Sequence, residues 1–416
     1  MPLTVARCSI GSSTQPACLG EGEELSVDPG RRRRTLPLAY AGSIIGLTGV
    51  QLIVPALPLL QRSLGLSDVQ LGVFTAVYLL PGVLLAAPIG FLADRLGRKV
   101  LFVASSAVFG LAGGLLFGVH DVPTVFLLRG LQGVAFACLF PLTLTMVGDV
   151  TPADGHVREQ GRRSIYMALA DVALPMVGAA VVALGTFAPF LVQTSALGLA
   201  VLGLLLLPHD RGGYGRPTSA TELLRVFRTA PSIALQLAGL YRFLFKFVIY
   251  SYGGLLLFDR GFSPQMIGVM VGLLSVANVL AAAACRAWAY RFPGPRLIAL
   301  ALVAAGAGMA ITAAASTAPL LVLAFWLLGL ADGLLGVLTN AYMMEMTDSA
   351  GRGSYVAMTG AVRNLGKFAA PTLAGGLLWL LPLSGVFGVF AVLAFLAPIT
   401  LRPLGATASA QPELRR

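Results

Sequence analysis

The chain has 416 residues, of which 57% are hydrophobic and only 11% are charged, and its formal net charge is +11. Soluble domains carry about 25% charged residues, so this composition excludes a soluble enzyme and a disordered chain. A nucleic-acid-binding protein is also excluded, because the charges lie between long apolar runs and not on one soluble basic face. Lipid is therefore the expected environment of most of the chain.

Apolar runs long enough to cross a bilayer, about 18 residues or more, recur along the chain. The first six expected spans are 36–60, 70–93, 99–119, 122–148, 163–186 and 188–207. After a polar gap, six more are expected at 233–257, 264–287, 296–316, 318–344, 354–380 and 383–401. We therefore predict an all-α integral membrane protein with twelve transmembrane helices in two six-helix halves, 36–207 and 233–401.

The segments outside the two halves are polar. Residues 1–35 lack the apolar core of a secretory signal, which predicts a disordered tail, and residues 402–416 form a second tail. In the linker 208–232, Ser219 and Glu222 have capping-box spacing. This spacing predicts a short amphipathic helix on the membrane surface.

Basic residues indicate the orientation of the spans. Lys and Arg concentrate in both tails and in the loops after even-numbered spans, whereas the opposite loops hold only Arg62 and Arg260. By the positive-inside rule, both tails are predicted to lie on the cytoplasmic side of the cell membrane. The run Arg31–Arg34 is either a plain positive-inside anchor or a site of contact with anionic lipid.

The second half repeats features of the first in the same order and at a nearly constant offset. The matches are Gly65 with Gly261, Ser67 with Ser263, Gly72 with Gly268, Gly133 with Gly333, and Pro175 with Pro371. Two six-span halves related by a parallel repeat, with a site near the bilayer midplane between them, form a recurring plan of membrane transporters. The repeat therefore predicts a site between the halves.

The loop after the second span reads GFLADRLGRKV, from Gly90 to Val100. This run resembles the signature loop of the major facilitator superfamily. The resemblance implies the twelve-helix fold of that family and transport of a small-molecule substrate by alternating access, in a monomer without enzymatic activity. The counterpart in the second half, RAWAYRFPGPR, keeps the basic residues and lacks the Gly and Asp pattern.

In that family the loop acts as a conformational latch between the halves. The resemblance implies this role for Gly90, Asp94, Gly97 and Arg98. Asp149, at the end of the fourth span, is the predicted partner of Arg98. The alternative is that the loop only anchors the topology through its basic residues.

Ionisable side chains inside spans cost about 2.5 to 3.5 kcal/mol each and normally face a cavity or a partner. The spans hold the bases Arg129, Arg242, Lys246, Arg363 and Lys367 and the acids Asp171 and Asp332. Two basic pairs have a spacing of four, so each pair shares one helix face, where like charges repel. We predict that these two pairs, Arg242 with Lys246 and Arg363 with Lys367, form a positive wall for an anionic substrate. Pairing with the two acids, together with snorkelling, is the alternative.

Three of these residues are candidates for proton coupling. Arg129 lies in LLRGLQG, which resembles an arginine motif of the family's fourth span, and the resemblance implies a role in proton coupling; a buried structural arginine is the alternative. Asp171 and Asp332 are acids at membrane depth that suit reversible protonation. Since Asp171 and Lys367 both lie four residues before a matched proline, we expect them to face each other.

The resulting prediction is proton-coupled transport of a small amphipathic anion, with Gln51 and Trp326 as further substrate-binding candidates. A proton-driven exporter of lipophilic cations is the first alternative and a sugar-like neutral-solute porter the second. Drug exporters of the family usually carry a Gly before the fifth-span proline, where this chain has Leu174, and an acid in the first span, where it has Gln51.

Neither a metal-ligand spacing nor a nucleotide-binding P-loop occurs, so no metal and no cofactor is expected.

Overall fold

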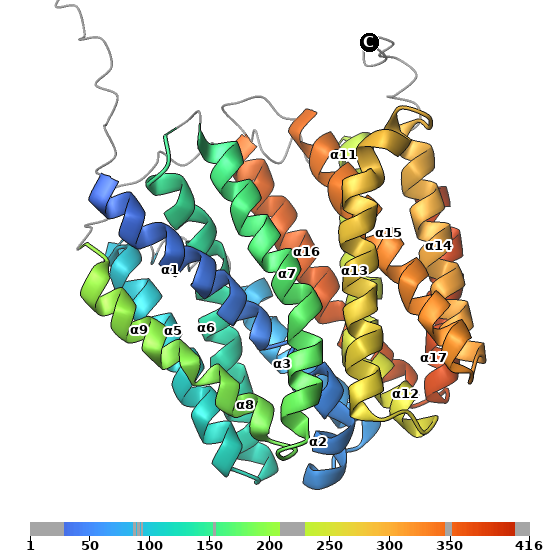
Figure 1. Cartoon of the computed structure of the whole chain (residues 1–416). Coiled ribbons are helices and arrows are strands. Elements are labelled where there is room, and N and C mark those ends of the chain that lie inside the picture. The colour runs from blue at the N-terminus through green and yellow to red at the C-terminus, as the bar shows by residue number, and fades with distance from the viewer. Residues whose placement is uncertain are drawn as a thin grey trace, which may run out of the picture.

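The computed structural model describes residues 29–85, 89, 92, 95–152, 155–208, 229–345 and 352–403. Within these ranges every regular element is a helix, and the helices form one bundle (Figure 1). The expected linker helix with Ser219 and Glu222 lies outside the described residues, as do Gly90 and Asp94 of the predicted latch.

Helices occupy the position of every expected span. The amino-terminal half contains α1 (Pro29–Thr48), the 3₁₀ turn η1 (Val54–Ala56), α2 (Leu57–Leu64), α3 (Asp68–Leu84), α5 (Arg98–Gly118), α6 (Val122–Asp149), α7 (His156–Val182), α8 (Ala188–Gln193) and α9 (Ser195–Leu206). The carboxyl-terminal half contains α11 (Ala230–Val248), the π-helix η3 (Ile249–Gly253), α12 (Gly254–Asp259), α13 (Pro264–Ala289), α14 (Gly294–Ala314), α15 (Ala318–Glu345), α16 (Arg352–Leu377) and α17 (Leu383–Thr400). Among the described residues, nine helical stretches are long and apolar enough to cross a membrane, and α3 is a shorter apolar helix. The bundle is consistent with the predicted twelve spans.

The first helix begins earlier than predicted. Residues 29–35 belong to α1, so the boundary between tail and first span at residue 35 is wrong. Arginine is a good helix former, and proline fits the first helical position. In addition, Arg32 Nη2 lies 2.8 Å from Glu159 Oε1 on α7, so tertiary contact holds this first turn.

The span expected at 36–60 is interrupted, because the chain leaves the α-helix after Thr48 and resumes it at Leu57. Gly49 favours the break, and Pro55 has no backbone N–H to continue the helical hydrogen bonds. The seventh span contains the π-helix η3 at the corresponding place of the second half. Each half therefore begins with an irregular span.

The turns before α3 and α13 confirm the repeat at the level of single atoms. Gly65 and Gly261 both have positive φ, 64° and 89°, which glycine adopts without steric cost. Ser67 and Ser263 then cap the two helices, each accepting a hydrogen bond from the backbone N–H three residues later, at 3.2 and 3.3 Å. Matched residues thus make matched structures.

The packing of the helices repeats in the same way. In the amino-terminal half α1 packs on α7, α3 on α6, and α5 on α6 and α9. In the carboxyl-terminal half α11 packs on α16, α13 on α15, and α14 on α15 and α17. Gly133 lies against the backbone of Tyr78, and its match Gly333 lies against the backbone of Asn278. The two halves are therefore structural copies.

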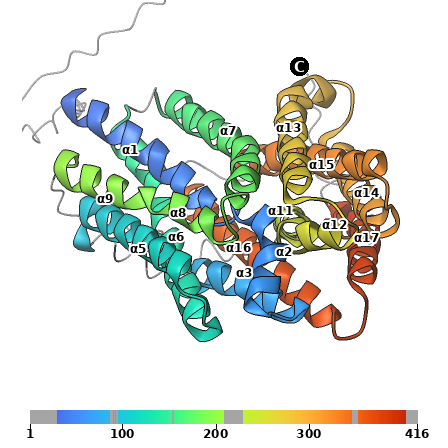
Figure 2. The ribbon, with the colours of Figure 1, turned by 60° about the horizontal axis from the view of Figure 1, so that its bottom comes forward.

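The most extensive contacts between the halves are those of α7 with α13 and of α3 with α16 (Figure 2). Backbones approach closely there. A Cβ atom on Gly72 would lie 2.9 Å from Pro371 O, and one on Gly268 would lie 2.7 Å from Pro175 O. The matched glycines and prolines of the repeat thus meet each other across the boundary.

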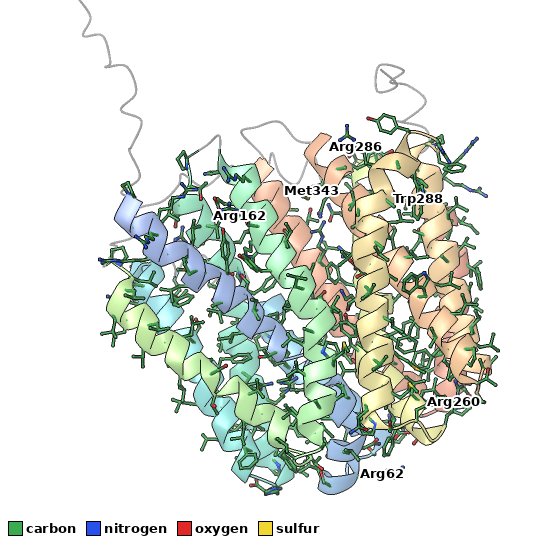
Figure 3. All side chains as sticks on the ribbon, viewed as in Figure 1. Arg62, Arg162, Arg260, Arg286, Trp288 and Met343 are labelled. Atoms are coloured by element: carbon green, nitrogen blue, oxygen red, sulfur yellow. The ribbon has the colours of Figure 1, made fainter. Side chains whose placement is uncertain are left out.

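Basic side chains mark the two ends of the bundle. Arg62 and Arg260 lie at one end, and Arg162 and Arg286 lie at the other (Figure 3). This arrangement agrees with the alternation of loops inferred from the sequence. The close glycine contacts between the halves lie toward the end that carries Arg62, because Gly72 follows closely after α2.

Candidate functional site

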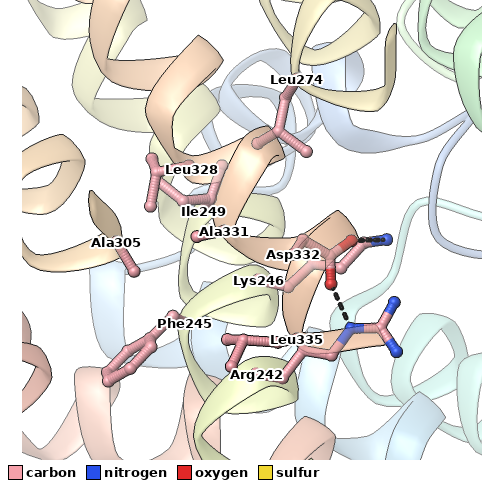
Figure 4. A pocket seen from close by; sticks show the side chains of 10 residues that line it. All are labelled: Arg242, Phe245, Lys246, Ile249, Leu274, Ala305, Leu328, Ala331, Asp332 and Leu335. Atoms are coloured by element: carbon pink, nitrogen blue, oxygen red, sulfur yellow. Dashed lines mark hydrogen bonds and ion pairs between the residues drawn. The ribbon is translucent and has the colours of Figure 1, made fainter. Parts of the chain in front are cut away.

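A cluster of charged side chains lies between the helices at mid-height of the bundle. Asp332 on α15 accepts hydrogen bonds from Arg242 Nε at 2.6 Å and from Lys246 Nζ at 2.9 Å, both on α11 (Figure 4). Asn278 on α13 donates a further hydrogen bond to Asp332. The Asp332 side chain is only 5% exposed, so its charge is compensated almost entirely by protein groups. As predicted, the two basic residues share one face of their helix.

Lys246 connects the two halves. Its Nζ lies 3.5 Å from Asp171 Oδ2 on α7, in addition to its bond to Asp332. Gln51, in the break of the first span, donates a hydrogen bond to the other oxygen of Asp171. We call Arg242, Lys246, Asp171 and Asp332 the charge cluster. It places one ion pair across the boundary between the halves.

The expected pairing of Asp171 with Lys367 does not occur. Lys367 Nζ donates to Asn364 Oδ1 at 3.0 Å and lies over the rings of Phe243 and Phe140, at 5.0 and 5.8 Å from their centroids. The reason is helix packing: α7 borders α13, whereas α16 borders α3. Equivalent positions of the two halves therefore do not face each other.

The second basic pair has amide partners. Arg363 Nη2 on α16 donates to Asn340 Oδ1 on α15 at 2.6 Å. Arg363 and Lys367 lie one turn apart on α16, where like charges repel. Within the part of the chain that the structure describes, neither Arg363 nor Lys367 forms an ion pair. The region around the cluster thus holds four cations and two carboxylates.

Arg129 lies elsewhere, at the break of the first span. Its side chain is buried, with Nη2 donating to Gly49 O at 2.5 Å and Nη1 to Gln132 Oε1 at 3.0 Å. The guanidinium also lies 4.1 Å from the centroid of the Tyr78 ring. Arg129 therefore satisfies a carbonyl that the broken helix leaves open, which supports the structural alternative considered for it.

A second side chain acts on the same break. Gln193 Nε2 on α8 donates to Thr48 O at 3.2 Å, and its Oε1 accepts from Gln132 at 2.6 Å. These bonds hold the broken segment in place, and Gln51 of that segment contacts Asp171. Arg129 is thus linked to the charge cluster indirectly: it bonds to Gly49 O, and Gln51, two residues further along the chain, bonds to Asp171.

The described part of the predicted latch contains one ion pair. Gly97 has a φ of 83° and precedes α5, whose first residue, Arg98, places its Nε 3.0 Å from Asp149 Oδ2. Arg98 and Asp149 thus lie at ion-pair distance, and their role in a latch stays a prediction. The ion pair ties the end of α6 to the start of α5 within the amino-terminal half.

Trp326 is not brought to the cluster. It is half-buried on α15, six residues before Asp332, which turns it about 120° away around the helix. Three amides that bond to the charged groups were not predicted from the sequence: Asn278, Asn340 and Asn364. An amide at membrane depth was the signal that would have found them.

A cavity of about 20 Å³ adjoins the cluster inside the carboxyl-terminal half. Arg242, Lys246 and Asp332 line one side, and apolar side chains such as Phe245 and Leu274 line the rest (Figure 4). This volume holds about one water molecule, so the cavity is too small for an organic solute. Across the described ranges, no group of three or more His, Cys, Asp or Glu side chains is arranged to hold a metal ion.

A membrane protein built from two repeated helical bundles, with charged side chains joined across their boundary, has the architecture of a solute transporter. The sequence model of the Major Facilitator Superfamily matches residues 39–259 and 237–416. The chain belongs to this superfamily, and its long apolar helices are those of a multi-pass membrane protein.

Relatives by sequence include transporters from two bacteria. The Quinolone resistance protein NorA of Staphylococcus aureus (strain MRSA252) is 24% identical over 242 residues, which cover 56% of this chain and 61% of NorA. The Uncharacterized MFS-type transporter Rv1877 of Mycobacterium tuberculosis (strain ATCC 25618 / H37Rv) is 29% identical over 167 residues, 40% of this chain and 24% of Rv1877. The chain thus spans less than two thirds of the length of both relatives.

Solved structures share the fold at low sequence identity. The crystal structure of the nucleoside transporter NupG matches with a TM-score of 0.73 at 15% identity, covering 90% of this chain and 98% of NupG. A bacterial homologue of the human lysosomal transporter Spinster, in an inward-facing and occupied conformation, matches with a TM-score of 0.73 at 13% identity, covering 94% and 99%. These matches establish the fold of the whole bundle.

The contacts of Asp171 predict a specific energetic coupling. In a double-mutant cycle on stability, Asp171→Asn and Lys246→Met should be non-additive by about 0.5 to 3 kcal/mol, because the two side chains form an ion pair. The parallel cycle of Asp171→Asn with Lys367→Met should be additive within about 0.5 kcal/mol. Unfolding of the wild type, the three single variants and the two double variants in detergent, followed by circular dichroism, measures both cycles. Stronger coupling of Asp171 to Lys367 than to Lys246 would contradict the structure.

Proposed function

We propose that this chain is a secondary active transporter that moves a small amphipathic anion across the cytoplasmic membrane by alternating access, coupled to protons. In this proposal both tails and the basic loops lie on the cytoplasmic side, as the positive-inside rule indicates. The residues that bind and couple are those at the boundary between the halves, where a parallel repeat places its site.

The observation that carries the proposal is the excess of positive charge at that boundary. Asp332 is shared by Arg242 and Lys246, while Arg363 and Lys367 have amide partners and no ion pair within the described residues. Cations inside transmembrane spans need compensation by acids, water or a ligand. A bound carboxylate, sulfonate or phosphate supplies the missing negative charge.

The rings beside Lys367 favour an amphipathic anion over a small inorganic one. Phe140 on α6 and Phe243 on α11 flank its ammonium group from opposite halves. An aromatic or aliphatic body can pack between such rings while the charged head contacts Lys367 and Arg363. A solute bound in this way contacts both halves, which alternating access requires.

Asp171 is the proposed proton acceptor. Its protonation disrupts one ion pair of 3.5 Å to Lys246, whereas protonation of Asp332 disrupts two, of 2.6 and 2.9 Å. The Asp171 side chain is also more exposed, 23% against 5%. Loss of its charge frees Lys246 from the amino-terminal half and thereby loosens the link between the halves.

The test combines ligand binding with flux. In detergent, an aromatic carboxylate that binds the native state should raise the free energy of unfolding by RT ln(1 + [L]/Kd), about 2.7 kcal/mol at a hundred times Kd. Arg363→Gln with Lys367→Gln should abolish this stabilisation, whereas the exposed control pair Arg291→Gln with Arg296→Gln should preserve it. In proteoliposomes, Asp171→Asn should lose uptake driven by a pH gradient and retain exchange of solute.

Three outcomes would contradict the proposal. If no anion stabilises the chain, or if stabilisation survives in the Arg363 and Lys367 variant, the anion site is wrong. If Asp171→Asn still accumulates solute in response to a pH gradient, Asp171 is not the coupling residue. Stabilisation by neutral sugars alone would favour a neutral-solute porter.

A proton-driven exporter of lipophilic cations is the second candidate, favoured by the similarity to NorA, which is named for quinolone resistance. In that case Asp171, the more exposed of the two acids, is the cation-binding group. The same binding experiment separates the candidates. Stabilisation by lipophilic cations that disappears in Asp171→Asn would establish the exporter and leave the basic pairs as structural partners.

A further inference from the structure

A groove of about 620 Å³ lies between the first turns of α1 and the last turns of α9, away from the charge cluster. The two helices run side by side at the edge of the amino-terminal half (Figures 1 and 2). Leu38, Leu199 and Leu202 form part of its apolar wall, while Gly30, Arg33 and Arg34 line its upper end. The groove is therefore amphipathic along its length.

The two arginines at this groove are available to a ligand. Both side chains are exposed, and within the described residues neither donates a hydrogen bond or forms an ion pair. Their neighbour Arg32, by contrast, is bonded to Glu159. Arg33 and Arg34 thus present uncompensated positive charge at one end of an apolar groove.

The wall formed by α9 lies on the apolar outer surface of the bundle. Its residues next to the groove are strongly exposed apolar side chains, with Leu204 57% and Leu205 72% exposed. From Gly30 to Ala41 the groove follows α1 for about 16 Å, which is roughly half the hydrocarbon thickness of a bilayer. This depth matches one leaflet, and the arginines lie at the same end of the bundle as the other basic loops.

We propose that this groove binds an anionic glycerophospholipid of the cytoplasmic leaflet. The phosphate contacts Arg33 and Arg34, and an acyl chain lies along Leu38 and Leu202. Clusters of Lys and Arg beside a transmembrane helix attract anionic headgroups in this way. The site is independent of solute transport, and it fixes the start of α1 beside the Arg32 to Glu159 ion pair.

The experiment is native mass spectrometry of the full chain, released from detergent after equilibration with phosphatidylglycerol or phosphatidylethanolamine. The wild type should retain phosphatidylglycerol in preference to phosphatidylethanolamine. Arg33→Gln with Arg34→Gln should weaken its binding roughly 30-fold, since each basic residue near the membrane surface contributes about a factor of five. Leu202→Trp, which fills the groove and leaves both charges, should weaken it as well. The control pair Arg291→Gln with Arg296→Gln removes the same charge elsewhere and should have no effect.

Other outcomes overturn the proposal. Equal retention of both lipids, or loss in the control pair, would show that binding is not specific to this groove. Binding that survives Leu202→Trp would reduce the site to a charged surface, and competition by soluble glycerophosphate would show that the acyl chain contributes nothing. Lipid that binds only after removal of residues 2–28 would show that this segment fills the groove. Circular dichroism of each variant confirms that it is folded.

Discussion

Replacing Gly72 and Gly268 with leucine should hold the two halves apart at the end that carries Arg62, and solute flux should fall at least tenfold. A Cβ at either position would lie within 3 Å of a proline carbonyl oxygen of the opposite half, a distance that neither backbone can accommodate without moving. The halves then cannot close there, and alternating access requires that they do.

Spin labels measure this opening directly. Ser63 on α2 and Gln265 on α13 are exposed and lie on opposite halves at that end, so cysteines introduced there report the distance between the halves. The distribution should shift to longer distances in the double variant. Gly198→Leu is the matched control, because a Cβ atom on Gly198 would have no other atom within 4 Å. Unchanged distances with unchanged flux would show that the glycine contacts do not control closure.

The second large effect is expected from Asp332→Ala. This change leaves Arg242 and Lys246 buried without their shared carboxylate, and it should lower the free energy of unfolding by about 3 to 5 kcal/mol. Replacing all three residues with apolar ones, Asp332→Ala with Arg242→Met and Lys246→Met, should recover most of that stability. Transport should nevertheless be absent in the triple variant, since the charge cluster has lost three of its four charged residues.

Denaturant titration in detergent, followed by circular dichroism, gives the stability of each variant. Asp259→Ala, which removes an exposed acid at the end of α12, is the control and should change the free energy of unfolding by less than about 0.5 kcal/mol. A single Asp332→Ala variant as stable as the wild type would mean that water or another group compensates the two cations. The charge cluster would then lose its assigned structural role.

The sequence by itself determined the spans and their repetition. Long apolar runs can only be helices in lipid, because every backbone polar group must be satisfied within the segment. Local signals also sufficed for the turns: Gly65 and Ser67, with their matches Gly261 and Ser263, adopt the same capped turn. The spacing of Arg242 and Lys246 placed them correctly on one helix face, because that relation depends on one helix alone.

Partners on different helices were harder to predict. Arg98 and Asp149 lie at ion-pair distance because both stand at helix ends on the same side of adjacent spans. Asp171 with Lys367 failed, although the repeat places them at equivalent positions. Equivalence under the repeat says which residues occupy corresponding sites, whereas contact depends on which helices pack together.

Only the tertiary structure decided the rest of the site. It showed that Lys246 joins Asp171 to Asp332, that Arg129 and Gln193 satisfy the carbonyls of the broken first span, and that a groove forms beside Arg33. Each of these features combines side chains from helices far apart in the chain. Hydrophobic periodicity and spacing describe neighbours along one helix, and the direction in which a helix presents its polar groups becomes fixed only when the bundle packs.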